Sequence, residues 1–262
     1  MGSPQENQSR VVLVRDRSAV DDAHKINTNI VANMIDAAVK ALVETDDSRD
    51  AWRYFVKADD HVGIKYTKCS WMRVHTDMSL VDSIKSRLLD IGLTKDKIEA
   101  KDAGMNVKTC SALINVPSVK VHSLTGIAAS IKNYINFVSN PSDYHLDLSG
   151  KLGEIWQRAE IKDKTRLIIV DALRPYFGPG PQIDPRHRWD YKGILAGTDP
   201  VALDTVCLEI CQKKRNLFRN EEWTIAPPPI HIKEADTKYH LGTSDRSRIN
   251  LTKLGWEQDL LI

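Results

Sequence analysis

The 262-residue chain has few of the features that mark the common functional classes of protein. Its 37 lysines and arginines nearly balance 35 aspartates and glutamates, and it contains no block of basic residues. A net charge of +2 without a basic block argues against a nucleic-acid partner. No apolar run is long enough to cross a bilayer, so we expect no membrane insertion. The composition is that of an ordinary globular domain, since 42% of residues are hydrophobic and 27% are charged.

Several catalytic motifs are also missing. The chain has no glycine-rich dinucleotide fingerprint, no Walker loop and no serine elbow with histidine and aspartate partners. Its four cysteines lack the Cys-x-x-Cys spacing of zinc ribbons and iron–sulfur clusters; they are Cys69, Cys110, Cys207 and Cys211. The last two lie one helical turn apart in an apolar segment, which favours buried structural thiols.

What the sequence does contain is an alternation of strand and helix patterns. Short apolar runs predict strands at 11–15, 61–66, 97–100, 112–116, 166–170 and 193–196. Apolar residues at helical spacing predict helices at 29–44, 79–92, 125–140, 148–158 and 201–213. This alternation predicts an α/β fold with a mostly parallel or mixed sheet and helices on both faces.

The ends of the chain differ from this pattern. Residues 1–10 are polar and read as a disordered start, either a trimmed end or a remnant of cloning. We expect residues 11–214 to form the α/β domain. Residues 215–262 are polar and proline-containing, and we expect an irregular C-terminal arm packed on the same domain.

The centre of the chain concentrates polar residues of one kind. A buried strand ends at Pro117, and Lys120 and His122 follow at a spacing of two, which places them on one face of an extended segment. Thr125 is a candidate helix cap, with Lys132 two turns into the predicted helix. Two lysines, a histidine and a helix N-terminus predict an anion-binding site. The alternatives are an ordinary polar strand edge and, for Lys132, a surface lysine with a buried stem.

Polar residues also end or follow predicted strands, where ligands bind in parallel sheets. These residues are Lys65, Asn115, Asp171 and Asp199. A carboxylate that ends a core strand needs a partner, so Asp171 is a functional candidate. Asp199 precedes a proline and is equally explained as a helix cap.

Several motifs together resemble the family called domain of unknown function 362. They are Asn-x-Pro followed by Lys-x-His and Lys-Asn within 115–133, Trp52 with Val62–Lys65, Asp171–Ala172, Gly178–Pro181 and Thr198–Asp204. The resemblance covers most of the chain. Where many relatives have Val-Asn after the lysine, this chain has Tyr66-Thr67. Relatives of this type often carry a twin-arginine export signal, so the resemblance implies an exported or periplasmic protein whose signal has been removed. Some relatives add a ferredoxin-like cysteine cluster, which is absent here.

We therefore expect an enzyme that acts on a small anionic or carbohydrate-like substrate by proton transfer. The expected catalytic residues are His122, Lys120, Lys132 and Asp171, and the expected substrate-binding residues are Lys65, Asn115, Asn133, His145 and Asp199. Asp171 and Asp199 could instead bind a divalent metal together. The alternative is a metal- or iron–sulfur-associated redox or binding protein with Cys69, Cys110, His122 and His145 as ligands. A third possibility is a scaffold subunit whose polar crevice binds a partner chain.

Overall fold

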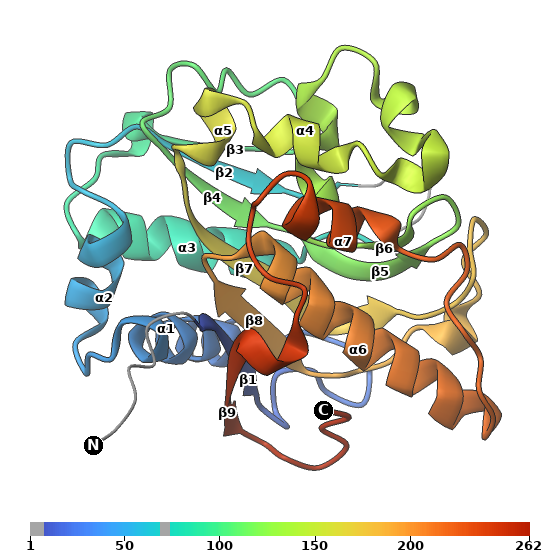
Figure 1. The fold of residues 1–262 in the computed structure, drawn as a ribbon. Helices are drawn as coiled ribbons and strands as arrows, with labels where there is room; N and C mark the ends of the chain where they lie inside the picture. Colours follow the sequence, from blue (N-terminus) through green and yellow to red (C-terminus); the bar gives the residue numbers. More distant parts are fainter. Residues whose placement is uncertain (1–7, 69–73) are drawn as a thin grey trace, which may run out of the picture.

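The computed structural model describes residues 8–68 and 74–262. A single mixed sheet of nine strands runs through this part of the chain (Figure 1). Its main order is β3-β2-β4-β7-β8-β1-β9, and the β5–β6 hairpin joins it at β7. The strands are β1 (Ser9–Arg15), β2 (Val62–Tyr66), β3 (Ile98–Lys101), β4 (Ala112–Val116), β5 (Ser118–His122), β6 (Gly126–Ala128), β7 (Thr165–Tyr176), β8 (Gly193–Gly197) and β9 (Ile249–Gly255).

The strand directions divide the sheet into two parts. Strands β3, β2, β4 and β7 run parallel, as expected for alternating strands and helices. Strand β8 is antiparallel to both β7 and β1, and β9 is parallel to β1. The predicted α/β class with a mixed sheet is confirmed.

Helices cover both faces of the sheet (Figure 1). Successive side chains of β4 point to opposite faces of the sheet, so Ile114 packs in one apolar core and Leu113 in the other. The first core contains α1 (Thr28–Val43), α2 (Ser48–Phe55) and α3 (Met78–Asp90), and the second is formed with α4 (Leu152–Trp156), α5 (Ala159–Lys162), α6 (Pro200–Arg219) and α7 (Ile230–Thr237). Cys207 and Cys211 are buried in the second core as free thiols.

The segment predicted as a helix from Thr125 to Asn140 is different in the structure. Its first part is β6, which pairs antiparallel with β5, and a 3₁₀ helix, η2 (Lys132–Phe137), follows. Gly126 has φ of +75°, which suits a hairpin rather than a helix start, and the Thr125 hydroxyl donates to the Ile127 carbonyl. The predicted helix N-terminus at Thr125, and its contribution to an anion site, is therefore wrong.

A second predicted helix is shorter than expected. Leu148 has φ of +53° and lies in a 3₁₀ turn, so helical geometry in the 148–158 segment is confined mainly to the five residues of α4. The last 48 positions, in contrast, are more regular than expected, because they contain the end of α6, all of α7 and the edge strand β9. Along the described residues, no helix combines the length and apolar character needed to cross a membrane.

Candidate functional site

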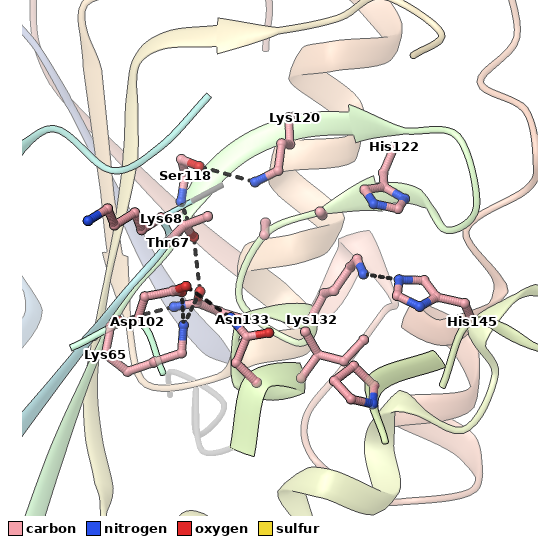
Figure 2. A pocket seen from close by; sticks show the side chains of 15 residues that line it. Lys65, Thr67, Lys68, Asp102, Ser118, Lys120, His122, Lys132, Asn133 and His145 are labelled. Atoms are coloured by element: carbon pink, nitrogen blue, oxygen red, sulfur yellow. Dashed lines mark hydrogen bonds and ion pairs between the residues drawn. The ribbon is translucent and has the colours of Figure 1, made fainter. Parts of the chain in front are cut away.

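A cavity of about 370 Å³ opens where the end of β2, the β5–β6 hairpin and η2 meet (Figure 2). Its floor includes apolar residues of β6 and η2, and most of its remaining wall is polar. The 15 lining residues are Lys65, Thr67, Lys68, Asp102, Ser118, Lys120, His122, Ala128, Ala129, Lys132, Asn133, Ile135, Asn136, Pro141 and His145.

Positive charge dominates this cavity. Four of its lining residues are lysines and two are histidines, whereas the lining contains a single carboxylate, Asp102. Three of the lysines are buried, with exposed fractions of 0% for Lys65, 5% for Lys120 and 7% for Lys132. Buried lysines are rare unless they are paired or functional, so this concentration of cations makes the cavity the candidate functional site.

Lys65 serves to hold the cavity wall together. Its ammonium group donates to the Tyr66 carbonyl at 2.8 Å, to Asp102 at 2.9 Å and to the Asn133 side-chain oxygen at 3.1 Å. These three bonds use all of its hydrogens. Burial lowers the pKa of Lys65 to about 8, and the charge of Asp102 opposes this shift.

Two asparagines and a threonine complete this framework. The Asn133 amide donates to the Lys65 carbonyl and, at 2.6 Å, to Asn115, whose own amide donates to the Ser130 carbonyl. Thr67 donates to Asn133 at 2.9 Å and accepts from the Ser118 amide. The asparagines thus join β2 and β4 to the start of η2, and Asn115 lies behind the cavity lining. Thr67, just beyond the end of β2, thus takes part in the same network.

Lys120 and His122 project from β5 into the cavity, as their spacing predicts (Figure 2). Lys120 donates to the Ser118 hydroxyl at 3.2 Å. Nδ1 of His122 accepts from the Leu124 amide at 3.2 Å, so in the neutral ring the proton is on Nε2. Burial, followed by the charges of Lys132 and Lys120, lowers the pKa of His122 to about 2. Near neutral pH this histidine is an uncharged hydrogen-bond donor.

Lys132 and His145 form a close pair on the opposite side of the cavity. The Lys132 Nζ and His145 Nε2 atoms are 2.6 Å apart, and the imidazole rings of His145 and His122 are stacked with centroids 5.7 Å apart. Burial and the charge of Lys132 lower the pKa of His145 to about 4, while a hydrogen bond to the backbone of Pro141 acts in the opposite sense. His145 is therefore neutral at pH 7 and accepts a hydrogen bond from the ammonium group.

Two buried titratable residues, Asp204 and His231, lie outside the lining. Asp204 of α6 accepts from the Ser130 amide at 2.6 Å and the Ile131 amide at 3.0 Å, which fixes the backbone just before Lys132. Burial raises the pKa of Asp204 to about 7. His231 of α7 has an exposed fraction of 0%, and neither of its ring nitrogens has a hydrogen-bond partner.

Asp171 and Asp199 do not line the cavity. Strand β7 continues to Tyr176, so Asp171 lies within the strand, and its carboxylate accepts from the Asp77 amide at 2.7 Å and the Leu173 amide at 2.9 Å. Asp199 caps α6 by accepting from the amides of Val201 and Ala202, and it also accepts from the Thr243 amide. Both carboxylates find their partners in backbone amides, which explains their position without a ligand.

The Asp171 contacts lead to a prediction. Replacing Asp171 with alanine leaves the buried Leu173 amide and the partly buried Asp77 amide without an acceptor, so we expect the free energy of unfolding to fall by about 2 kcal/mol. Ligand binding in the cavity should be unchanged. Denaturant unfolding and a binding titration test both statements, and weakened binding in a variant that is still folded would place Asp171 in the functional site.

Sequence reasoning did not single out several lining residues. Asp102 follows β3 directly, so the same rule that selected Lys65 and Asn115 could have found it. Ser118, Lys68 and Asn136 carry no comparable signal, because they are common polar residues at a strand start, in a loop and in a 3₁₀ helix. The importance of Asp204 arises from a contact across 73 positions, which no local pattern reveals.

No group of three or more histidine, cysteine, aspartate or glutamate side chains is placed to hold a metal ion within residues 8–68 and 74–262. Of the four ligands predicted for a metal or cluster, His122 and His145 line the cavity, while Cys110 is buried near the Asn106 carbonyl. Cys69 lies outside the described residues.

The fold and the cavity define an α/β protein with a cationic pocket beside its β5–β6 hairpin. A family model described as "Domain of unknown function (DUF362)" matches residues 64–209, which is more than half of the chain, and the protein belongs to this family. Every cavity-lining residue falls within the matched segment. Searches of the curated proteins and of the solved structures found no match.

Proposed function

We propose that this protein is an enzyme that binds a small anionic molecule in the cavity and catalyses proton transfer there. The observation that supports this proposal is the charge of the lining, with four lysines and two neutral histidines against one carboxylate that is already bonded to Lys65. A carboxylate or phosphate group of the ligand would be held by Lys120, Lys132 and the Nε2 proton of His122. Hydroxyl groups of a carbohydrate-like ligand would face Ser118, Asp102 and Asn136.

The cavity size suits such a ligand. Its volume of about 370 Å³ lies near the lower end of the range of about 300–1,000 Å³ for small-molecule sites. The apolar residues Ala128, Ala129 and Ile135 supply one wall, so the carbon skeleton of the ligand has a surface to pack against.

The acid–base groups differ from the expected assignment. His122 uses Nδ1 to accept from the Leu124 amide, so it serves as a neutral donor to a developing negative charge. Proton exchange with the ligand is better assigned to the Lys132–His145 pair, whose nitrogen atoms share one short hydrogen bond. Asp171 has no role in this proposal.

Replacing Lys120 with methionine should weaken anion binding by about tenfold or more, because it removes a charge-assisted contact. The melting temperature should not fall, because the substitution removes one of several neighbouring buried cations, whose burial and mutual proximity are unfavourable. Thermal shift and calorimetry with small carboxylates, sugar phosphates and their uncharged analogues, at low salt, provide the measurement. Exposed Lys95 offers the matched control, Lys95→Met.

Proton transfer is tested separately by incubating the anions that bind in D₂O and following the loss of carbon-bound protons by NMR. Equal binding of charged and uncharged compounds would contradict the anion site. Binding without exchange at any carbon of any bound compound would contradict the proton-transfer part of the proposal.

A further inference from the structure

The three buried lysines of the cavity differ in the groups to which they donate. Lys65 is paired with a carboxylate and two other oxygen atoms, and Lys120 donates to a hydroxyl. Lys132 donates to an imidazole nitrogen, 2.6 Å away. A neutral imidazole can take a proton from an ammonium group, and a lysine without its proton is a nucleophile.

We propose that Lys132 forms an imine with an aldehyde or ketone that carries an anionic group, and that His145 accepts the proton from its amine. This inference rests on the proposed function, because it uses the same cavity and names a class of substrate for it. In this arrangement Lys132 is the nucleophile, His145 is its base, and the Pro141 backbone orients the base. Activated nucleophiles in enzymes have the same three parts.

The reaction balances within the groups present. The Lys132 ammonium passes one proton to His145, and its nitrogen attacks the carbonyl carbon. The carbonyl oxygen takes one proton from the attacking nitrogen, which gives the carbinolamine, and a second proton back from His145, and it then leaves as water. The Lys132 ammonium and one carbonyl group thus give one protonated imine and one water molecule, and His145 is neutral again. No oxidant or reductant is required.

Neighbouring residues suit this chemistry. His122 presents its Nε2 proton on the same cavity, where it can donate to the carbonyl oxygen, and Lys120 can hold the anionic group. The protonated imine withdraws electrons from the adjacent carbon, which makes a proton on that carbon easier to remove. Imine formation would thereby supply a route to the proposed proton transfer. Lys65 is a poor alternative nucleophile because its hydrogens are all engaged in the wall.

Reductive trapping tests the inference. The protein is incubated with pyruvate, glyoxylate or glyceraldehyde 3-phosphate in the presence of borohydride, and adducts are located by peptide mass spectrometry. We expect about a tenfold excess of adduct at Lys132 over exposed lysines such as Lys95, because the reactive group is positioned beside its base. Acetone and propanal, which lack the anionic group, should give no such excess.

Variants distinguish a nucleophilic role of Lys132 from a structural one. Lys132→Met and Lys132→Arg should both abolish trapping, and the arginine variant, which keeps the charge, should bind anions more tightly than the methionine variant. His145→Gln should slow trapping about tenfold or more and shift its pH dependence, since the proton acceptor is lost. Circular dichroism and melting curves establish that each variant is folded.

The possible results have distinct meanings. Anion binding without preferential adduct at Lys132, or with adduct centred on Lys120, would overturn the imine proposal and leave the anion site intact. If no anion binds and no adduct forms, both proposals fail. Lys132 adducts that form equally with charged and uncharged carbonyls would contradict the named substrate class.

Discussion

Replacement of Lys65 by methionine is expected to lower the free energy of unfolding by about 3 kcal/mol, because it removes the cation from a buried ion pair and leaves the Asp102 carboxylate without a counter-charge. The side chain of Lys65 is 1% exposed and that of Asp102 is 17% exposed, so water can replace the lost contact only in part. The Asn133 oxygen also loses one of its two donors. Denaturant unfolding at pH 7 measures this loss.

A double-mutant cycle distinguishes the ion pair from packing. Asp102→Asn in the Lys65→Met background removes the uncompensated charge, so the double variant should recover part of the lost stability. Lys95→Met is the surface control and should change stability by less than about 0.5 kcal/mol. A loss of less than about 1 kcal/mol for Lys65→Met would show that the wall does not depend on this lysine.

Acid sensitivity is the second property for which a large effect is expected. Burial, followed by the charge of Lys132, lowers the pKa of His231 to about 3, against about 6.5 in an unfolded chain. Between these values the unfolded state binds more protons than the folded state, so this residue reduces stability progressively as pH falls below about 6.5. Through His231 alone, lowering the pH from 7 to 5 should reduce the free energy of unfolding by about 2 kcal/mol.

His231→Leu should therefore stabilise the protein, and by more at pH 5 than at pH 7. At pH 7 the gain comes from removing two buried ring nitrogens without partners and should be about 2 kcal/mol. At pH 5 the wild type is further destabilised because His231 binds a proton in the unfolded state, so the gain from the substitution should roughly double. Urea unfolding at both pH values, with exposed His61→Leu as the control, provides the measurement.

The difference between variant and wild type is the quantity to compare. Burial raises the pKa of Asp171 to about 6 and that of Asp204 to about 7, so these carboxyls bind protons more readily in the folded state and offset part of the acid loss in the wild-type protein. The His231→Leu variant and the wild type both contain Asp171 and Asp204, so the contribution of these carboxyls cancels in the difference. Equal stabilisation at pH 5 and pH 7 would mean that His231 has an ordinary proton affinity.

Sequence reasoning predicted the layers of this fold because their signals are local. The apolar spacing of α1 and α3, the continuous apolar start of β7 and the Asp199–Pro200 start of α6 can each be read from a few neighbouring residues. The convergence of Asn115, Lys120, His122, Lys132 and Asn133 was also predicted. The structure brings the last four around one cavity, and Asn115 lies behind its lining, bonded to Asn133.

The geometry that brings them together was not predicted correctly. The 125–140 segment has apolar residues that suit a helix, but its conformation depends on pairing with β5 and on the Asp204 carboxylate from α6. Asp171 was misplaced for a similar reason, since strand β7 extends past it and its carboxylate accepts from the distant Asp77 amide as well as from the nearby Leu173 amide. Contacts between remote parts of the chain decided each case.

The position of β1 has a consequence for synthesis of the protein. This strand precedes the other described strands in the sequence, yet both of its sheet neighbours, β8 and β9, belong to the last third of the sequence. Until those residues are made, the apolar segment Val11–Val14 has no strand to pair with and must remain unassembled. A nascent chain interrupted before β9 would expose one edge of β1, so it would be a natural target for chaperones and for edge-to-edge aggregation.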